Sequence, residues 1–577
     1  MDIQRQVQLP EVYKALIAER DSLLAKARVI AEKCNGLAPI SKLMPEIMLR
    51  IFALNSGPLN KEMDHGTTDL PNQRSIDPTK DLRIISQVCQ HWRVLALRSP
   101  TLWNVALDCN LPPQWMAELL RRSQSIPFKM RVDLLNRQPA RTMANFRSSL
   151  PEFHRLEGLT AFADDSSFAE ILFKLIKRPL PMLRMLVLTI NYEPATYPEE
   201  EDISDHEYES SVSDDPAYDE DECFLPEFPD ESCKILTLAT RGCLFRLDSP
   251  IYQNLTDLSV FEITGKIPLL SEWISCLQKI ENLTSLVLVH AMPKHRSMLH
   301  MPQLSLPHLT DLRLVGHSAS CCQFLDQLAI NPLRSFDIRF RHAIHSKAEM
   351  MKLVDVIIPH LDHQAKTNSF DSLKIIFTNS HFEFTNTESP KKFKPYFRVH
   401  LSSVEGFRLR VSNASDSDSG DIDNYDDAQG PSHFMMNQVL IALMTPFVPI
   451  KSIQIDYETT LCDIGIHLPM SHKTGTPAAT MQQLFPVSPD QLRSLTMSSM
   501  GGNLEIDMLK AYLMWRIELG KPLEHLRFTS HRLNRLPDHC EQLRQYCGTL
   551  TWEKRAVGGY MTAGDSDGDM VSMIWGS

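Results

Sequence analysis

Apolar residues recur in one short pattern over most of the chain. From residue 156 onward the pattern is Leu-x-x-Leu-x-Leu, or the same spacing with other apolar residues. Its copies begin at residues 156, 183, 255, 283, 309, 333, 370, 404, 450, 492 and 523. The copies at 255, 283, 309 and 333 are 28, 26 and 24 residues apart. Alternating apolar positions predict a short β-strand, and segments 268–280 and 318–330 between the copies predict helices.

One such unit cannot bury its apolar face alone, so neighbouring units must stack. The pattern and spacing resemble leucine-rich repeats. The asparagine or cysteine that regular repeats place after the last leucine is replaced by Ile263, Ala291, His317 and Arg341. The resemblance therefore implies an irregular α/β leucine-rich-repeat solenoid over residues 105–577. An α/β domain with coincidental copies of the pattern is the alternative.

The first residues follow a helical pattern. Residues 10–33 place Val12, Leu16, Leu23, Ala27 and Ile30 at helical spacing, so we predict an N-terminal helix within residues 1–36. A coiled-coil dimer is one interpretation of this stripe. A helix that packs on its own chain or stays on the surface is the other.

Two more apolar helical segments follow. In "ISKLMPEIMLRIF", Pro45 suits the first helical position and Glu46 the positive helix start. A second stripe in "LRIISQVCQHWRVLAL" predicts another apolar helix. Short helices over about sixty residues cannot bury so many large apolar groups by themselves. Some of these side chains should face another protein or the rest of the chain.

These segments resemble an F-box of the fungal type. The resemblance rests on Leu43, Pro45, Glu46 and Ile47, then on Val88, Cys89 and Trp92, and finally on Leu102 and Trp103. Met44 stands where many relatives carry proline, and residues 57–76 lengthen the link between the helices. The match covers residues 40–103 and continues faintly through 115–134, which predicts a helix followed by a strand.

An F-box over residues 37–104 implies a substrate receptor of an SCF-type (cullin–RING) ubiquitin ligase, which binds that ligase's adaptor and thereby its cullin. The adaptor-binding residues that the resemblance implies are Leu43, Pro45, Glu46, Ile47, Ile51, Val88, Cys89 and Trp92. Alternatively, Leu43, Ile47, Val88 and Trp92 form the core of a small helical cap, and both interpretations can hold at once. A leucine-rich-repeat scaffold not coupled to ubiquitination is the alternative function.

Charge is concentrated in one segment. The formal net charge is −12, and residues 193–232 hold 17 Asp or Glu and no Lys or Arg, so the remainder carries −12 + 17 = +5. This near-balance argues against nucleic-acid binding. We predict that residues 193–232 and 412–430 are disordered acidic insertions.

In the repeats, residues between the leucines should face away from the core. This face either is solvated and has no partner or binds a target. In this set Arg313, Lys374, Arg408, Arg410 and Arg527 are the basic residues that we predict to bind an acidic or phosphorylated protein segment.

No motif indicates catalysis, a cofactor or a metal. The twelve cysteines include no CxxC pair, and the histidine pairs at 342–345 and 360–363 are expected on loops. No apolar run suits a membrane span and no secretory signal pattern opens the sequence. We therefore expect a cytoplasmic or nuclear protein that is not an enzyme and binds no membrane.

Overall fold

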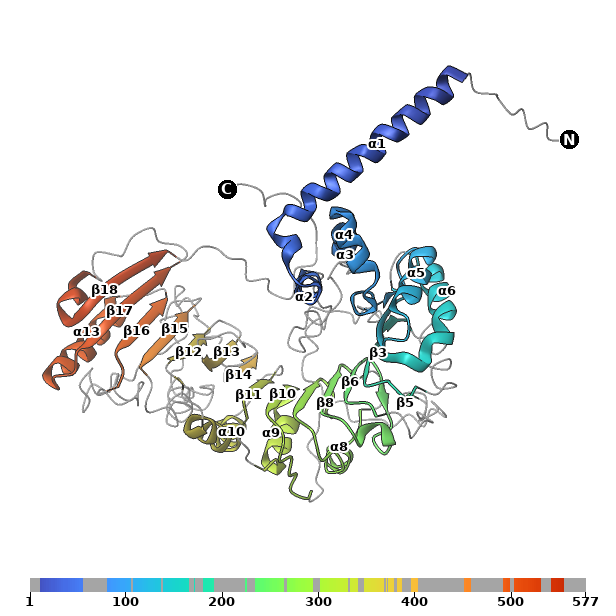
Figure 1. Ribbon diagram of the computed structural model, residues 1–577. Coiled ribbons are helices and arrows are strands. Elements are labelled where there is room, and N and C mark those ends of the chain that lie inside the picture. Colours follow the sequence, from blue (N-terminus) through green and yellow to red (C-terminus); the bar gives the residue numbers. More distant parts are fainter. Residues whose placement is uncertain are drawn as a thin grey trace, which may run out of the picture. The chain divides into compact units, whose positions relative to one another are not determined.

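The computed structural model describes residues 11–55, 80–104, 107–135, 138–164, 171, 180–190, 224–225, 234–263, 267–293, 301–329, 333–340, 347–367, 370, 372–377, 381–386, 396–402, 451–457, 491–498, 503–530 and 541–554. The chain divides into two compact units: residues 1–266 with 279–283 form unit 1, and residues 267–278 with 284–577 form unit 2. Both units combine helices with parallel strands (Figure 1), so the fold class is α/β.

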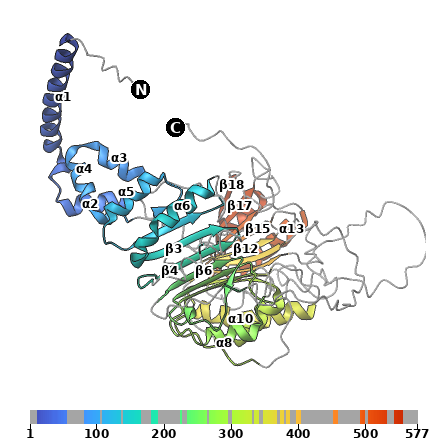
Figure 2. The same ribbon diagram turned by 90° about the vertical axis from the view of Figure 1, so that its right-hand side faces the viewer.

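Unit 1 begins with helices. In chain order these are α1 (Glu11–Leu37), η1 (Pro39–Lys42), α2 (Pro45–Asn55), α3 (Lys80–Val88), α4 (Gln90–Leu97) and η3 (Pro100–Leu102). The predicted N-terminal helix is thus confirmed, and Figure 2 shows α1 as one unbroken helix. None of its residues is buried, so α1 does not pack on the described part of the chain.

The second predicted apolar helix is two helices. Cys89 separates α3 from α4 with an extended backbone (φ −155°, ψ 169°), and its sulfur accepts a hydrogen bond from the Trp92 N–H at 3.5 Å. Cys89 therefore caps the start of α4, where an acceptor side chain satisfies a free backbone N–H. The periodicity of the apolar residues continues through the break and does not reveal it.

The rest of unit 1 is a parallel sheet with helical connections. Its strands lie in the order β1 (Leu107–Asp108), β2 (Phe128–Asp133), β3 (Leu156–Ala163), β4 (Met185–Ile190), β6 (Thr237–Arg241) and β8 (Asp257–Phe261). Figure 2 shows β3, β4 and β6 side by side. The connecting helices are α5 (Pro113–Ser123), α6 (Pro139–Ser149), η4 (Leu150–Arg155) and η5 (Pro250–Tyr252). The helix and strand expected within 115–134 are α5 and β2.

One prediction about the acidic segment is wrong at two residues. Phe224 and Leu225 form β5 (Phe224–Leu225), which pairs in parallel with β7 (Leu244–Phe245). This short apolar pair lies within the 193–232 segment and can add backbone hydrogen bonds despite its acidic neighbours. The rest of that segment, and residues 412–430, lie outside the described residues.

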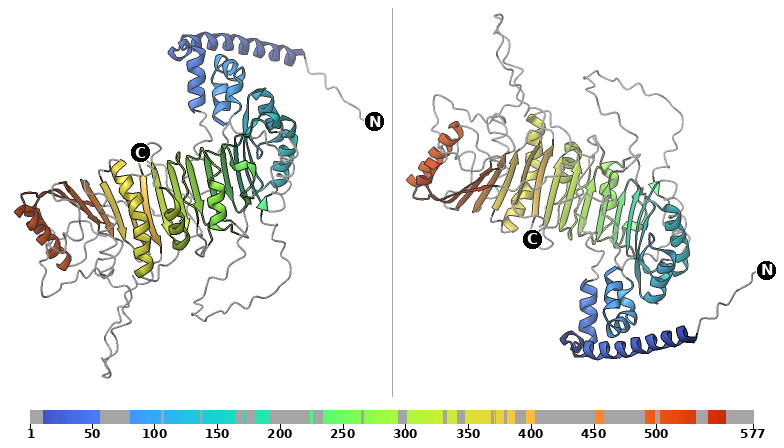
Figure 3. Two further views of the ribbon diagram at one scale, coloured as in Figure 1. Left: turned by 90° about the horizontal axis from the view of Figure 1, so that it is seen from below. Right: turned by 90° about the horizontal axis from the view of Figure 1, so that it is seen from above.

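Unit 2 carries the longer row of strands. Their order is β9 (Ser285–Val289), β10 (Asp311–Gly316), β11 (Ser335–Phe340), β14 (Tyr396–Ser402), β13 (His381–Asn386), β12 (Ser372–Phe377), β15 (Ser452–Tyr457), β16 (Ser494–Ser498), β17 (Leu523–Ser530) and β18 (Cys547–Lys554). The helices are α8 (Leu270–Leu277), α9 (Ser318–Gln327), α10 (Lys347–Thr367), α13 (Asn503–Glu518) and η7 (Gln542–Tyr546). In Figures 1 and 3, α8, α9 and α10 lie on one face of their neighbouring strands.

The repeated apolar pattern forms strands as predicted. Every copy within the described residues coincides with a strand, and the copy at 404 lies outside them. In the copy that forms β10, the three leucines of the pattern are at most 1% exposed: Leu309 just before the strand, and Leu312 and Leu314 within it. Just before the strand, the Thr310 N–H donates to the Thr284 carbonyl at 2.8 Å. An equivalent bond from Arg493 precedes β16, and one from Glu524 stands at the start of β17. Each repeat therefore starts in register with its neighbour.

The strand order departs from a plain succession of repeats. The antiparallel strand β13 lies between β12 and β14, and β14, rather than β12, pairs with β11. Successive strands of a regular solenoid lie side by side, so this hairpin interrupts the expected stacking. Helix α10 is also new, because His360 and His363, expected on a loop, lie within it.

Candidate protein-interaction surfaces

Helices α2, α3 and α4 have an internal core of their own. Met48, Phe52, Leu82 and Ala96 are fully buried and Ile85 is 8% exposed. The Phe52 and Trp92 rings pack with centroids 5.1 Å apart at 53°. These contacts bury one side of each helix, so the α2–α4 module does not need its other apolar side chains for its own packing.

Trp103 joins this module to α5. Its ring is fully buried, and its Nε1 donates to the Ala96 carbonyl at the end of α4 at 2.7 Å. The Arg122 guanidinium lies over the Trp103 ring at 4.5 Å and donates to Glu118 at 2.7 Å. Hydrogen bonds from Arg121 and then Arg122 lower the pKa of Glu118 to about 2. Leu102 and Trp103, the last two residues of the F-box resemblance, thus belong to the core of unit 1.

A second face of η1 and α2 is apolar and exposed. We call this set the α2 stripe: Ile40, Leu43, Met44, Ile47, Ile51 and Leu54. Leu43 is 39% exposed, Met44 64%, Ile47 42% and Leu54 73%, and Ile51 is half-buried. From Met44 the members follow at positions +3, +7 and +10, which is one helix face. Apolar surface of this extent on a short helix is typical of a protein-binding site.

The residues predicted to bind an adaptor fall into two groups. Leu43, Pro45, Glu46, Ile47 and Val88 are exposed, the last by 55%. Ile51, Cys89 and Trp92 are half-buried, and the last two are engaged in the cap and in the ring contact with Phe52. Of the four residues that the helical-cap interpretation places in a core, Leu43, Ile47 and Val88 are therefore exposed and Trp92 is half-buried.

From η1 to α4, the sequence reasoning missed several exposed apolar residues as surface candidates, and the most exposed of them are Met44, Leu54 and Ile84. Met44 was noted only as a departure from the family pattern, and Leu54 and Ile84 were not singled out. Extending the +3, +7, +10 spacing from Met44 would have found Leu54. Ile84, 53% exposed, lies one turn before Val88 on α3 and extends the apolar exposure of that helix.

A second surface follows the strand register of unit 2. One row of directly opposite residues runs across ten strands, and we call it the cross-strand row: Val287, Arg313, Asp337, Arg398, Thr385, Lys374, Gln454, Thr496, Arg527 and Thr551. It brings three of the five predicted target-binding residues into one line. It also adds Arg398, which lies on β14 and outside the repeated pattern.

Two arginines of this row, Arg313 and Arg527, differ in exposure. Arg313 is 7% exposed, and its Nε lies 3.5 Å from Asp337 Oδ2, which also pairs with Arg339 at 2.9 Å. Arg313 is therefore not available at the surface, and the expectation that it faces a target is wrong. The cause is the next strand, which places a carboxylate directly opposite it. Arg527 is exposed, as expected.

The other predicted target-binding residues are Lys374, Arg408 and Arg410. Arg408 and Arg410 lie outside the described residues. Lys374 is described by its backbone register alone. In the row two residues further along the strands stand His400, Glu383, Ile376 and Asp456. Arg339 also belongs to this row, and Asp337 belongs to the cross-strand row. The two rows, about 7 Å apart, therefore each hold both basic and acidic residues.

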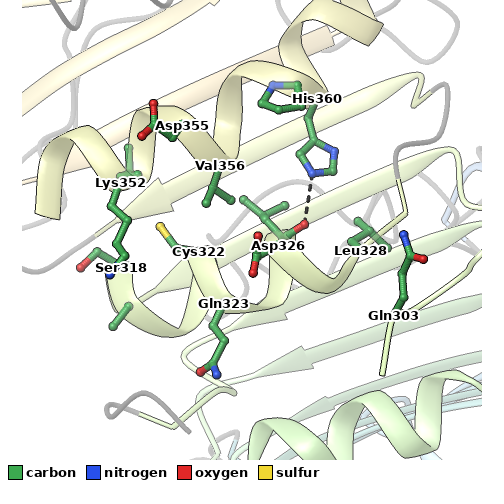
Figure 4. Close-up of a pocket in the computed structure, with 14 residues that line it drawn as sticks. Gln303, Ser318, Cys322, Gln323, Asp326, Leu328, Lys352, Asp355, Val356 and His360 are labelled. Carbon is green, nitrogen blue, oxygen red and sulfur yellow. Dashed lines mark hydrogen bonds between the residues drawn. The ribbon is translucent and has the colours of Figure 1, made fainter. Parts of the chain in front are cut away.

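A cavity of about 780 Å³ lies between α9 and α10 (Figure 4). Cys322 and Asp326 line it from α9, and Lys352, Asp355 and His360 line it from α10. His360 Nε2 donates to the Leu325 carbonyl at 3.2 Å, and its ring stacks on Phe336. Burial lowers the pKa of His360, so this ring is a neutral structural group at neutral pH.

Within the described ranges, no group of three or more His, Cys, Asp or Glu is arranged to hold a metal ion. None of the described helices is both long enough and apolar enough to cross a membrane. No known family profile, no curated protein and no solved structure matches this chain.

Proposed function

We propose that this chain is an F-box-type substrate receptor of an SCF-type ubiquitin ligase. In this role the α2–α4 module binds the ligase's adaptor subunit, through it the cullin, and the strands of unit 2 hold a protein target. The α2 stripe carries the proposal. Leu43 and Ile47 belong to the Leu-x-Pro-Glu-Ile match and remain 39% and 42% exposed beside a complete internal core.

The stripe suits a protein groove energetically. Interfaces draw most of their energy from a few large side chains that become fully buried. Fully burying a leucine or isoleucine side chain stabilises by about 1.5–3 kcal/mol. Taking the exposed fractions of Leu43 and Ile47, burial of the remaining surface would add about 1.2–2.4 kcal/mol together. This corresponds to about 8- to 60-fold in the dissociation constant.

On this proposal the chain itself makes and breaks no covalent bonds. It raises the effective concentration of the target beside the ubiquitin-conjugating enzyme. Such a receptor would work in the cytoplasm or the nucleus, where these ligases act.

The target surface that we propose is the C-terminal part of the cross-strand row. Arg527 is exposed, and Arg398 and Lys374 share its row in the strand register. Arginine pairs strongly with carboxylates and phosphates. The neighbouring row contains Glu383 and Asp456, so we propose that the target presents acidic groups along one line, with basic groups beside them.

The adaptor half is tested by binding of the full chain to the purified adaptor, measured by calorimetry and pull-down. We expect Leu43→Ala with Ile47→Ala to weaken binding about 8- to 60-fold. Leu135→Ala is the matched control, because Leu135 is 44% exposed but lies outside the module. An unchanged affinity in the double variant would reject the adaptor role.

The target half is tested separately by co-purification from cells. Arg527→Ser should reduce target capture and leave adaptor binding unchanged. Target capture without any adaptor binding would favour a leucine-rich-repeat scaffold that is not coupled to ubiquitination.

A further inference from the structure

Helix α1 presents a long apolar face that no described part of the chain covers. Leu16 is 57% exposed, Leu23 58%, Ile30 63% and Leu37 76%, and none of the helix's 27 residues is buried. Helices in proteins draw most of their stability from packing of an apolar face. The exposed face therefore indicates a partner outside the described chain.

The spacing identifies the partner as another helix. Leu16, Leu23, Ile30 and Leu37 recur every seven residues, and Tyr13, Arg20, Ala27 and Cys34 stand three residues before each of them. Alternating steps of three and four are the core positions of a coiled coil. A helix that packs on a globular core follows the 3.6-residue period instead and drifts from a strict seven-residue repeat by about 20° per heptad.

The same repeat on two copies is self-complementary in the antiparallel direction. With full overlap, Tyr13 lies opposite the partner's Leu37, and Leu16 lies opposite the partner's Cys34. Leu23 then lies opposite the partner's Ala27, so a large side chain meets a small one. A twofold axis doubles these contacts into eight layers over about 36 Å, from the 1.5 Å rise per residue.

Charge decides between the two directions. In a parallel pair, Arg20 would lie in the core opposite the partner's Arg20, and like charges repel there. In the antiparallel pair it lies opposite the partner's Ile30. Its guanidinium, 2.7 Å from Asp21, is held toward solvent while its stem packs. Glu19 also comes beside the partner's Lys33, which is a favourable flanking pair, whereas Lys26 comes beside the partner's Lys26. This second pair flanks the seam and can turn into solvent, so it costs less than an Arg20 pair within the core.

We propose that α1 pairs with α1 of a second copy of this chain as an antiparallel two-helix coiled coil. This proposal does not depend on the ligase role, because it rests on α1 alone.

The mass of the full chain in solution tests the pairing. Light scattering and sedimentation should show a dimer for the natural chain. Leu23→Asp with Ile30→Asp should raise the dimer dissociation constant by more than about 100-fold, since charges cannot be buried in packed layers. Val29→Asp is the control, because Val29 is 52% exposed on the same helix but lies outside the repeat. It should leave the dimer intact.

Disulfide formation under mild oxidation tests the direction. The variant Leu16→Cys should form a covalent dimer through Cys34, which is an exposed free thiol. Adding Cys34→Ser to that variant should abolish the link. A monomeric natural chain, a dimer that survives Leu23→Asp with Ile30→Asp, or a trimer would overturn the pairing. A dimer linked through Cys34 alone in the otherwise natural chain would overturn the antiparallel direction.

Discussion

Two adjacent residues of α2 should separate stability from binding. Met48 is fully buried in the α2–α4 module, whereas Ile47 is 42% exposed on the α2 stripe. Met48→Ala leaves a cavity in the core, and we expect it to destabilise the module by about 2–5 kcal/mol. Ile47→Ala removes a side chain that is only 58% buried (100 − 42). Because less apolar surface is lost from the core, the loss of stability is limited to about 1–1.7 kcal/mol.

Hydrogen exchange of the α2 backbone amides measures this difference in the full chain. Local opening of a module is read from the protection of its own amides, without requiring a single unfolding transition. Protection should fall about 30- to 5,000-fold in Met48→Ala and less than about 20-fold in Ile47→Ala.

Adaptor binding supplies the opposite test of the same pair. Under the proposed function, Ile47→Ala loses about 3- to 9-fold in affinity through contacts made only in the complex. Equal loss of amide protection in both variants would refute the division of α2 into a core face and a binding face.

Three further changes probe unit 1 and unit 2. Asp337→Ala should lower the free energy of unfolding by about 3–5 kcal/mol, because it removes the carboxylate that pairs with buried Arg313 and with Arg339. Thermal unfolding should show this loss, whereas exposed Arg527→Ser should change stability by less than about 0.5 kcal/mol. Trp103→Phe should lower stability by about 1–3 kcal/mol, because it removes the hydrogen bond from the indole N–H to the end of α4. Hydrogen exchange of the amides at the end of α4 should become faster in this variant. Burial lowers the pKa of His360 below 6.5, so the unfolded chain binds this proton more readily. Stability should therefore fall as the pH drops below about 6.5, and His360→Gln should reduce that slope in denaturation curves measured across this range. An unchanged slope would contradict the buried neutral ring.

The sequence predicted the strands well because their signal is local. Two apolar residues separated by one polar residue, preceded by a leucine at a turn, place alternate side chains in the core wherever the copy occurs. The copies at 309 and 523 formed β10 and β17 as expected. The helix over residues 10–33 was equally readable, since its periodicity extends over several turns. For the α2–α4 module, the sequence indicated which residues were apolar and that they were too many for so small a core.

Tertiary structure decided how those apolar residues divide. Helical spacing alone cannot distinguish the face with Met48 from the face with Ile47, because both are apolar and adjacent on α2. The choice depends on the position of Phe52 against Trp92, and on the break at Cys89 that turns α4. Neither is encoded in the period of the pattern.

The same holds for the cross-strand row. The sequence indicated which residues lie between the leucines, but pairing across strands depends on register and strand order. The β12–β14 hairpin brings β14 beside β11, so Arg398 enters the row. Arg313 is buried because β11 places Asp337 opposite it. Local alternation sets the face on which a side chain lies. The charge it meets there is contributed by residues distant in the chain, and only the folded sheet brings the two together.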